Sequence, residues 1–182
     1  MCLFRVTQLE NKEDLTCYKV LLIRKYKPRK NGYFSPFKKD HEWELGKTYE
    51  DTEEEEIRGK LSYDCKTTTQ NAFGGFFHSF KNGYEAAKLA AFMATRAKCY
   101  EGIGVAVCKC TIPKYAKTYR GFTETGWHIS PDVEGYASTK LRVDQIVVNY
   151  RFKNPDQSIY GEFDPTEKVY YKMLKRSTVK LI

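Results

Sequence analysis

The chain has 182 residues, of which 41% are hydrophobic and 30% charged. This balance is typical of a globular protein. No apolar run approaches the roughly 20 residues that a membrane-spanning helix needs, so we expect no membrane partner. The formal net charge of +8 favours anionic partners such as a nucleotide or a nucleic acid. An acidic block at residues 51–56 argues against a surface that binds nucleic acid uniformly.

The six cysteines include no CxxC pair, and only three histidines accompany them. Cys108 and Cys110 form a CxC on a predicted strand, where both thiols point to one face. This spacing does not predict a zinc site, so we expect neither a metal nor another cofactor. The N-terminal residues lack the apolar stretch of a secretory signal, and we therefore expect reduced thiols and a cytoplasmic protein.

We expect a single domain that comprises residues 1–182. In its first half, the sequence predicts short strands. Residues 17–23 are mostly apolar and indicate a core strand. Residues 27–39 are basic and contain two prolines and a glycine, so we expect a surface loop. Residues 41–45 alternate charged and bulky side chains, which indicates a short strand. Residues 50–72 are rich in Glu and Thr with few aliphatic side chains, so we expect an irregular, mobile insertion.

The clearest element is a helix predicted over residues 83–100. Asn82 is placed to cap its N-terminus, and Glu85 is placed to complete a capping box. Apolar residues recur at steps of three and four and form one face, whose small side chains allow close approach to a sheet. The residues of this face are Ala86, Leu89, Ala90, Met93 and Ala97.

Two strands and one further helix are predicted in the second half. Residues 105–112 indicate an apolar strand, and residues 114–136 contain three glycines and indicate a hairpin or a loop. Residues 141–152 predict a long strand whose apolar phase shifts at Gln145, as at a β-bulge. An Asp–Pro start predicts a helix over residues 164–176. We therefore expect the α+β class: a mixed, mostly antiparallel sheet with one central amphipathic helix and a C-terminal helix.

A glycine-led corner precedes the predicted helix. Gly74 and Gly75 allow a tight turn, and His78 and Ser79 follow near the expected rim. The first N–H groups of a helix point outward unpaired and favour negative charge, so this corner predicts a site for a phosphate or a small polar ligand. A plain strand-to-helix connection is the alternative, because the chain has no Walker lysine pattern and no GxGxxG.

An aromatic pair offers a second contact for a ligand. Trp127 and His128 follow a glycine and are placed to stack on a nucleobase. The alternative is a loop tryptophan that folds back onto the core. The spacing singles out no carboxylate pair and no nucleophile with its base, so the sequence does not identify catalytic residues.

The order of these elements resembles that of ADP-ribosyltransferase-like folds and of small proteins from bacterial and phage genomes. The resemblance covers roughly residues 17–148. It rests on a Tyr-x-Val strand, a Trp-x-Leu-Gly step, a Gly-Phe-x-x-Ser-Phe segment, an Ala-rich helix, a Val-x-Val strand that ends in Ile-Pro, and a late strand with an acid or amide. In that family the first strand supplies an Arg or His, a central strand a Ser or Tyr, and a late strand the catalytic Glu.

This chain departs from that pattern at two positions. Its first strand offers Tyr18 and Lys19, whereas Ser79 fits the central serine. The late strand offers Asp144 and Gln145 where the family has Glu. Because an amide does not stabilise an oxocarbenium ion as a carboxylate does, the resemblance implies a nucleotide-holding cleft rather than an active transferase.

We therefore expect a non-catalytic protein that binds a nucleotide or a related phosphate-bearing ligand. In a phage, such a protein would sequester a nucleotide signal of host immunity. The expected ligand contacts are Lys19, Arg24, Gly75, His78, Ser79, Trp127, His128, Arg142 and Gln145. Two alternatives stay open: an active transferase that uses NAD, with Asp144 in place of the glutamate, and a module that binds nucleic acid or protein through basic surfaces. The sequence does not define the oligomeric state.

Overall fold

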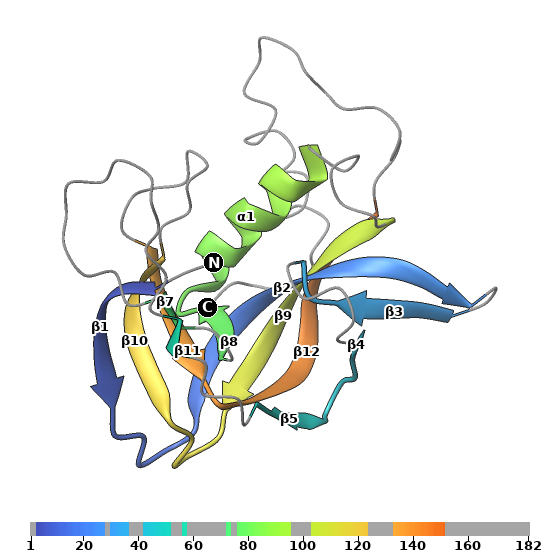
Figure 1. Cartoon of the computed structure of the whole chain (residues 1–182). Coiled ribbons are helices and arrows are strands. Elements are labelled where there is room, and N and C mark those ends of the chain that lie inside the picture. Colours follow the sequence, from blue (N-terminus) through green and yellow to red (C-terminus); the bar gives the residue numbers. More distant parts are fainter. Residues whose placement is uncertain are drawn as a thin grey trace, which may run out of the picture.

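The computed structural model describes residues 3–27, 30–36, 42–51, 56–57, 72–73, 76–95, 103–123 and 133–151. Within these ranges the protein consists of antiparallel strands and one helix (Figure 1). In chain order the elements are β1 (Leu3–Leu9), β2 (Leu15–Lys27), β3 (Lys30–Phe34), β4 (Glu42–Trp43), β5 (Thr48–Glu50), β6 (Glu56–Ile57), β7 (Ala72–Phe73), β8 (Phe77–Phe80), α1 (Gly83–Thr95), β9 (Gly104–Ile112), β10 (Thr118–Thr123), β11 (Val133–Ser138) and β12 (Lys140–Arg151). None of the described segments is a helix long and apolar enough to cross a membrane.

Ten of the described strands form one sheet. Its order is β1-β10-β11-β8-β2-β9-β12-β5, with β3 beside β2 and β4 beside β3. β1 leads into β2, β9 into β10 and β11 into β12, and the short connections are bonded to one another. The amide of Tyr115 donates to the carbonyl of Asn11 at 3.0 Å, and the amide of Thr139 donates to the carbonyl of Lys117 at 3.0 Å. These hydrogen bonds satisfy backbone groups of the connecting segments.

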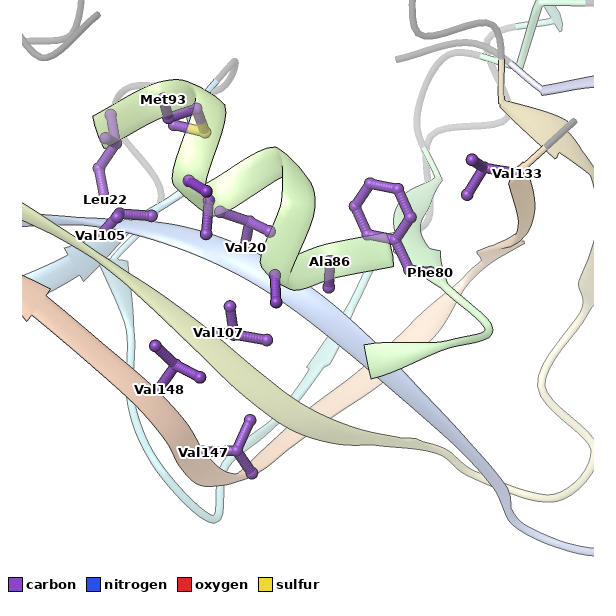
Figure 2. Packing of buried hydrophobic residues seen from close by; sticks show 13 residues of the cluster. Val20, Leu22, Phe80, Ala86, Met93, Val105, Val107, Val133, Val147 and Val148 are labelled. Carbon is purple, nitrogen blue, oxygen red and sulfur yellow. The ribbon is translucent and has the colours of Figure 1, made fainter. Parts of the chain in front are cut away.

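Helix α1 lies across one face of β2 and β9, which we call the helix face (Figures 1 and 2). Asn82 caps the helix, because its Oδ1 accepts a hydrogen bond from the amide of Tyr84 at 2.8 Å. Two alanines of the expected apolar face, Ala86 and Ala90, are fully buried against valines of the sheet, and Ala97 lies outside the described residues. Met93 is also fully buried, and burying a side chain of this size contributes about 1.5–3 kcal/mol.

The other side of the sheet, which we call the opposite face, holds a second core. Side chains alternate along a strand, so Val20 and Leu22 of β2 meet the helix while Leu21 and Ile23 enter the second core. Trp43 of β4 packs on this face, with its ring 4.8 Å from that of Tyr49 and 5.2 Å from that of Phe77. The segment that carries β4 and β5 therefore covers the opposite face with aromatic rings.

The expected α+β class with two helices is wrong for the described part of the chain. Every pairing between its named strands is antiparallel, and α1 is its single helix. The predicted helix over residues 164–176 lies outside the described residues. The described residues therefore form an antiparallel β architecture with one helix on a face. This helix has 13 residues and is short enough to cover only a few strands.

Several local predictions are confirmed. The core strand at residues 17–23 lies within β2, the strand at residues 105–112 within β9, and the helix begins at Gly83 as expected. β10 and β11 pair, so the hairpin alternative for residues 114–136 holds. The register of β12 against β9 shifts on both sides of Gln145, which confirms the bulge.

Other local predictions are wrong or lie partly outside the described residues. The expected loop at residues 27–39 contains β3, which pairs with β2 in spite of the nearby prolines. The glycine-led corner contains a strand, β8, so His78 and Ser79 are sheet residues. Of the expected insertion at residues 50–72, β6 pairs with β7, and most of the rest lies outside the described residues. A single domain over the whole chain stays a prediction.

The close approach of the helix to the sheet leads to a prediction about packing. Ala90→Leu should lower the free energy of unfolding by about 1–3 kcal/mol, because the added carbons have no space against the sheet. Chemical denaturation measures this change. The control is Lys88→Leu on the half-exposed side of the same helix, which should change stability by no more than about 0.5 kcal/mol. An equal effect of the two substitutions would mean that the helix does not pack closely at Ala90.

Candidate functional site

Strand β8 separates from β2 directly after they pair, and a buried lysine lies at this separation. The only register pair recorded between the two strands joins Tyr18 and Phe80. The ammonium Nζ of Lys19 donates to the carbonyl of His78 at 2.8 Å, so a side chain takes the place of a ladder partner. Lys19 is 7% exposed, and its Nζ lies 5.1 Å from the centre of the Trp43 ring. The charge is held by a carbonyl dipole and an aromatic face.

A line of polar side chains runs from this lysine across four strands of the opposite face. Ser79 of β8 is in register with Tyr136 of β11, and Tyr136 is in register with Arg120 of β10. Tyr18 of β2 is paired with Phe80 of β8. Because the strands are antiparallel, the residue after Tyr18, which is Lys19, lies opposite the residue before Phe80, which is Ser79. We call Lys19, Ser79, Tyr136 and Arg120 the polar row. Its burial decreases from the fully buried Ser79 to the exposed Arg120.

The hydroxyl of Ser79 differs from the other buried hydroxyls of this face. Ser138 donates its Oγ hydrogen to the carbonyl of Lys140 at 2.9 Å, and Thr118 donates to the carbonyl of Ala116 at 3.0 Å. Ser79 is 0% exposed, and its Oγ has no hydrogen-bond partner within the described residues. Because an unsatisfied buried hydroxyl costs about 1–3 kcal/mol, this group marks a position where a donor or acceptor is missing.

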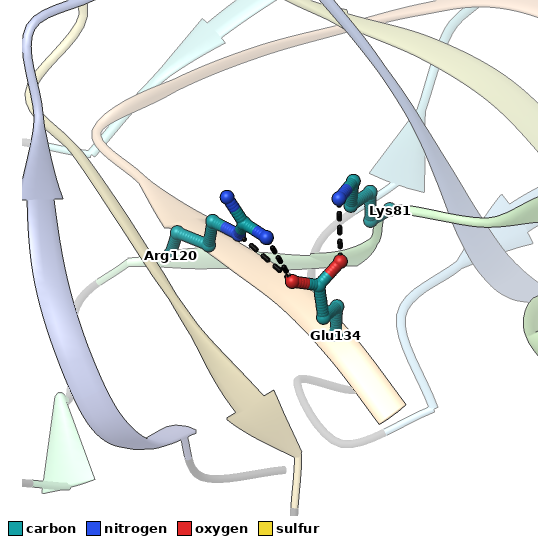
Figure 3. A network of polar contacts seen from close by, with 3 residues as sticks. All are labelled: Lys81, Arg120 and Glu134. Atoms are coloured by element: carbon teal, nitrogen blue, oxygen red, sulfur yellow. Dashed lines mark hydrogen bonds and ion pairs between the residues drawn. The ribbon is translucent and has the colours of Figure 1, made fainter. Parts of the chain in front are cut away.

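Three charged side chains form a network at the exposed end of the row (Figure 3). Lys81 Nζ donates to Glu134 Oε2 at 2.5 Å. Arg120 Nε donates to Glu134 Oε1 at 3.0 Å, and Nη2 of the same guanidinium also contacts this oxygen. A single carboxylate therefore pairs with two cations and offsets the charge of only one. With Lys19 nearby in the row, positive charge exceeds negative charge on this part of the face.

The charges of the network change the pKa of its members. The hydrogen bond from Lys81, and then that from Arg120, lowers the pKa of Glu134, so this carboxylate is ionised at neutral pH. Burial raises the pKa of Tyr136, although Lys81 and Arg120 act in the other direction. Tyr136 is therefore a neutral phenol beside two cations. Together these groups supply charge and hydrogen bonds suited to an anion.

The thiols beside the row do not add nucleophilic chemistry. Cys108 is in register with Lys19, but burial raises the pKa of its thiol to about 12. A hydrogen bond with Cys17, and then burial, raises the pKa of Cys110 well above its usual value. Cys17, Cys108 and Cys110 are free thiols on one face, and no group of metal-binding residues occurs among the described residues. The raised pKa values of Cys108 and Cys110 make these two thiols unreactive at neutral pH.

The expected ligand contacts divide between the two faces of the sheet. Lys19 and Ser79 are neighbours on the opposite face, as the polar row shows. His78 lies on the helix face, because it alternates with Phe77 and Ser79. Gln145 is paired with Lys109, away from the buried Cys108 and Cys110.

The remaining expected contacts are also away from the row or beyond the described residues. The guanidinium of Arg24 lies over the ring of Phe34, 5.4 Å from its centre. Arg142 Nε donates to Asp144 Oδ1 at 2.6 Å. Gly75, Trp127 and His128 lie outside the described residues.

The expected corner site does not have the expected form. Ser79 is buried in the sheet rather than near a rim, because β8 continues through this position. The cap formed by Asn82 engages the amide of Tyr84, one of the helix N–H groups that we expected to face a ligand. Glu85 pairs with Lys88 at 3.1 Å. The row, rather than the helix N-terminus, is therefore the candidate site.

The residues of an active transferase do not converge. Asp144 accepts hydrogen bonds from Thr111 Oγ1 and from Arg142 Nε, both at 2.6 Å. Thr111 alternates with Cys110 and Ile112 of the second core and therefore points to the side of the helix. Asp144 and Ser79 thus lie on opposite faces of the sheet.

Sequence reasoning missed four residues of the site: Lys81, Arg120, Glu134 and Tyr136. The alternation of residues 133–138 contains a usable signal, since Glu134, Tyr136 and Ser138 share one face once a strand is assumed. The register that sets Arg120 beside Tyr136 is a contact between strands, and a single sequence does not contain it.

Comparisons of this chain with protein-family models, curated proteins and solved structures found no match. The candidate site therefore rests on the geometry of the chain itself.

The hydroxyl of Ser79 allows a test that separates function from stability. Ser79→Ala should leave the free energy of unfolding unchanged or raise it, because a buried group without a partner is removed. Ser138→Ala on the same face should lower it by about 0.5–1.5 kcal/mol, because a formed hydrogen bond is lost. Urea denaturation of the two variants measures both values. A loss of stability in Ser79→Ala as large as that in Ser138→Ala would show that Ser79 is already satisfied.

The lowered pKa of Glu134 predicts a dependence of stability on pH. A carboxylate with a lowered pKa in the folded state stabilises the fold above its unfolded pKa of about 4.3. This stabilisation is lost as the pH falls through the lower, folded pKa. The difference in unfolding free energy between the wild type and Glu134→Gln should therefore be constant above about pH 5 and shrink below about pH 4. A difference that does not change between pH 3 and pH 7 would show that the network carries no ionic stabilisation.

Proposed function

We propose that this protein binds a nucleotide or a related phosphate-bearing ligand at the polar row and its charged network. The observation that carries this proposal is the fully buried Ser79 hydroxyl, which has no partner within the described residues and lies in register beside Tyr136. Lys81 and Arg120 lie at the accessible end and are 43% and 46% exposed in their side chains. Buried polar groups without partners commonly mark a place that a ligand completes.

Each residue has a role suited to its chemistry. Arg120 and Lys81 contact phosphate oxygens, since a guanidinium and an ammonium both form charge-assisted hydrogen bonds with phosphate. Ser79 and Tyr136 contribute hydroxyls further along the row. Lys19 is hydrogen-bonded to the carbonyl of His78 and adds positive charge at the buried end of the polar row, without contacting the ligand. Binding by these groups requires no reaction and no cofactor.

The resemblance to ADP-ribosyltransferase-like folds supports a nucleotide as the ligand. On this view the protein is a degenerate member that holds a nucleotide without transferring it, and in a phage it would sequester a nucleotide signal of host immunity. We favour binding over transfer because Asp144 is engaged by Arg142 and lies on the other face from Ser79. A cytoplasmic location stays a prediction of the sequence.

The competing proposal from another class is a nucleic-acid module. The net charge of +8 favours it, but the exposed cations of the charged network, Lys81 and Arg120, are both paired to Glu134 on one short stretch of sheet. A nucleic-acid interface would be expected to lose affinity steeply as salt rises, because several phosphates release counterions. A single phosphate-bearing ligand should show a shallow salt dependence.

The experiment is a thermal-shift panel of nucleotides, cyclic dinucleotides and nicotinamide dinucleotides. A ligand at 100 times its dissociation constant should stabilise the protein by about 2.7 kcal/mol. Arg120→Gln should weaken binding by about 1.5–3 kcal/mol, the scale of a hydrogen bond to a charged group. Arg142→Gln removes the same charge from the other face and should leave binding unchanged. Equal effects of the two substitutions, or binding only to long nucleic acids, would contradict the proposal.

A further inference from the structure

Glu134 pairs with both exposed cations of the charged network (Figure 3). Lys81 Nζ donates to its Oε2 at 2.5 Å, and Arg120 Nε donates to its Oε1 at 3.0 Å. The side chains of Lys81 and Arg120 are 43% and 46% exposed, whereas that of Glu134 is 28% exposed. An anion that arrives from solution therefore meets two accessible cations that already share a carboxylate.

The backbone, rather than this carboxylate, sets the positions of the two cations. The amide of Lys81 donates to the carbonyl of Glu134 at 3.1 Å, and this bond does not depend on the side chain at position 134. Arg120 is in register with Tyr136, and the pairing of β10 with β11 continues along the full length of both strands. Loss of the Glu134 carboxylate should therefore leave the backbone of both cations in place.

We propose that Glu134 is an inhibitory carboxylate, which lowers the affinity of the charged network for anionic ligands. This inference rests on the proposed function and adds what limits the affinity of that site. One carboxylate and two cations leave one net positive charge, whereas a neutral side chain at position 134 leaves two. Glu134 also accepts hydrogen bonds from both cations, which a phosphate would otherwise receive. Both effects oppose the binding of any anion.

An inhibitory role predicts opposite effects on stability and on binding. The ion pairs of Glu134 reach Arg120 of β10 and Lys81, which directly follows β8, so they connect neighbouring parts of the sheet. Glu134→Gln should therefore lower the free energy of unfolding while it tightens the binding of an anion. A carboxylate that only held the cations in position would change both in the same direction, because less ordered cations bind a ligand less well.

The experiment measures the binding of inorganic pyrophosphate and of AMP to the full chain by calorimetry at low ionic strength. Pyrophosphate tests the cations without a base or a sugar. Glu134→Gln should bind both probes roughly five- to twentyfold more tightly than the wild type, which is the scale of one added charge near a partly exposed site. The factor should decrease as salt is added, because salt screens this charge.

The matched control is Glu85→Gln, which removes a carboxylate paired with Lys88 at 3.1 Å on the helix. The Glu85 side chain is 20% exposed, close to the value for Glu134, and the net charge of the protein changes by the same amount. Glu85→Gln should bind both probes within about a factor of two of the wild type. An equal gain in the two variants would mean that only the total charge of the protein matters, and it would overturn the inference.

A measurement on the wild type provides a test if Glu134→Gln does not fold. Saturation with pyrophosphate should shift the NMR signal of the Arg120 Nε–H group, because its hydrogen bond to Glu134 competes with the ligand. The absence of this signal in Arg120→Gln assigns it. Pyrophosphate that binds without shifting this signal would contradict the inference.

The outcomes separate the two proposals. If neither the wild type nor Glu134→Gln binds pyrophosphate, AMP or another nucleotide, the proposed function fails and the inference fails with it. If nucleotides bind and Arg120→Gln weakens them, but Glu134→Gln binds them equally or less tightly, the proposed function stands. Glu134 is then a structural partner of the two cations, and the inference is wrong.

Discussion

The burial of one ammonium group organises the region around the candidate site. An ionised lysine in a protein core is costly unless it is paired or hydrogen-bonded, and Lys19 meets this requirement through the carbonyl of His78. That carbonyl is available because β8 leaves β2 after one register pair. The lysine thus joins two strands where the ladder between them ends. The Trp43 ring, 5.1 Å from the ammonium, shields the same charge from water.

The two faces of the sheet differ in the size of the side chains that pack on them. On the helix face, alanines bring α1 close to valines of β2 and β9, which leaves little space for a polar ligand (Figure 2). On the opposite face, Trp43 packs beside the rings of Tyr49 and Phe77. On the strands beyond β8, Tyr136, Glu134 and Arg120 follow with decreasing burial. The polar groups of the candidate site therefore belong to the opposite face.

The strongly patterned elements were predictable from the sequence. β2, β9 and β12 are apolar, and α1 has a regular alanine face with a cap, so local composition was sufficient. β8 was missed because adjacent glycines suggested a turn, although its Phe77 and Phe80 point to different cores as strand residues do. Lys19 and Ser79 were predicted as contacts, but Arg120 and Glu134 were not. Their proximity depends on the pairing of β10, β11 and β8, which lies in no single segment.

The electrostatics of the row favour recognition over reaction. Lys19 lowers the pKa of the Cys108 thiol, but burial raises it more, and the resulting value is about 12. The same balance holds for Tyr136, where burial outweighs two nearby cations. A nucleophile or a general base needs a pKa near neutral, and these groups are far from it. What the row and its charged network retain is fixed charge and fixed hydroxyl groups, which suit the binding of an anion, as proposed above, rather than a reaction.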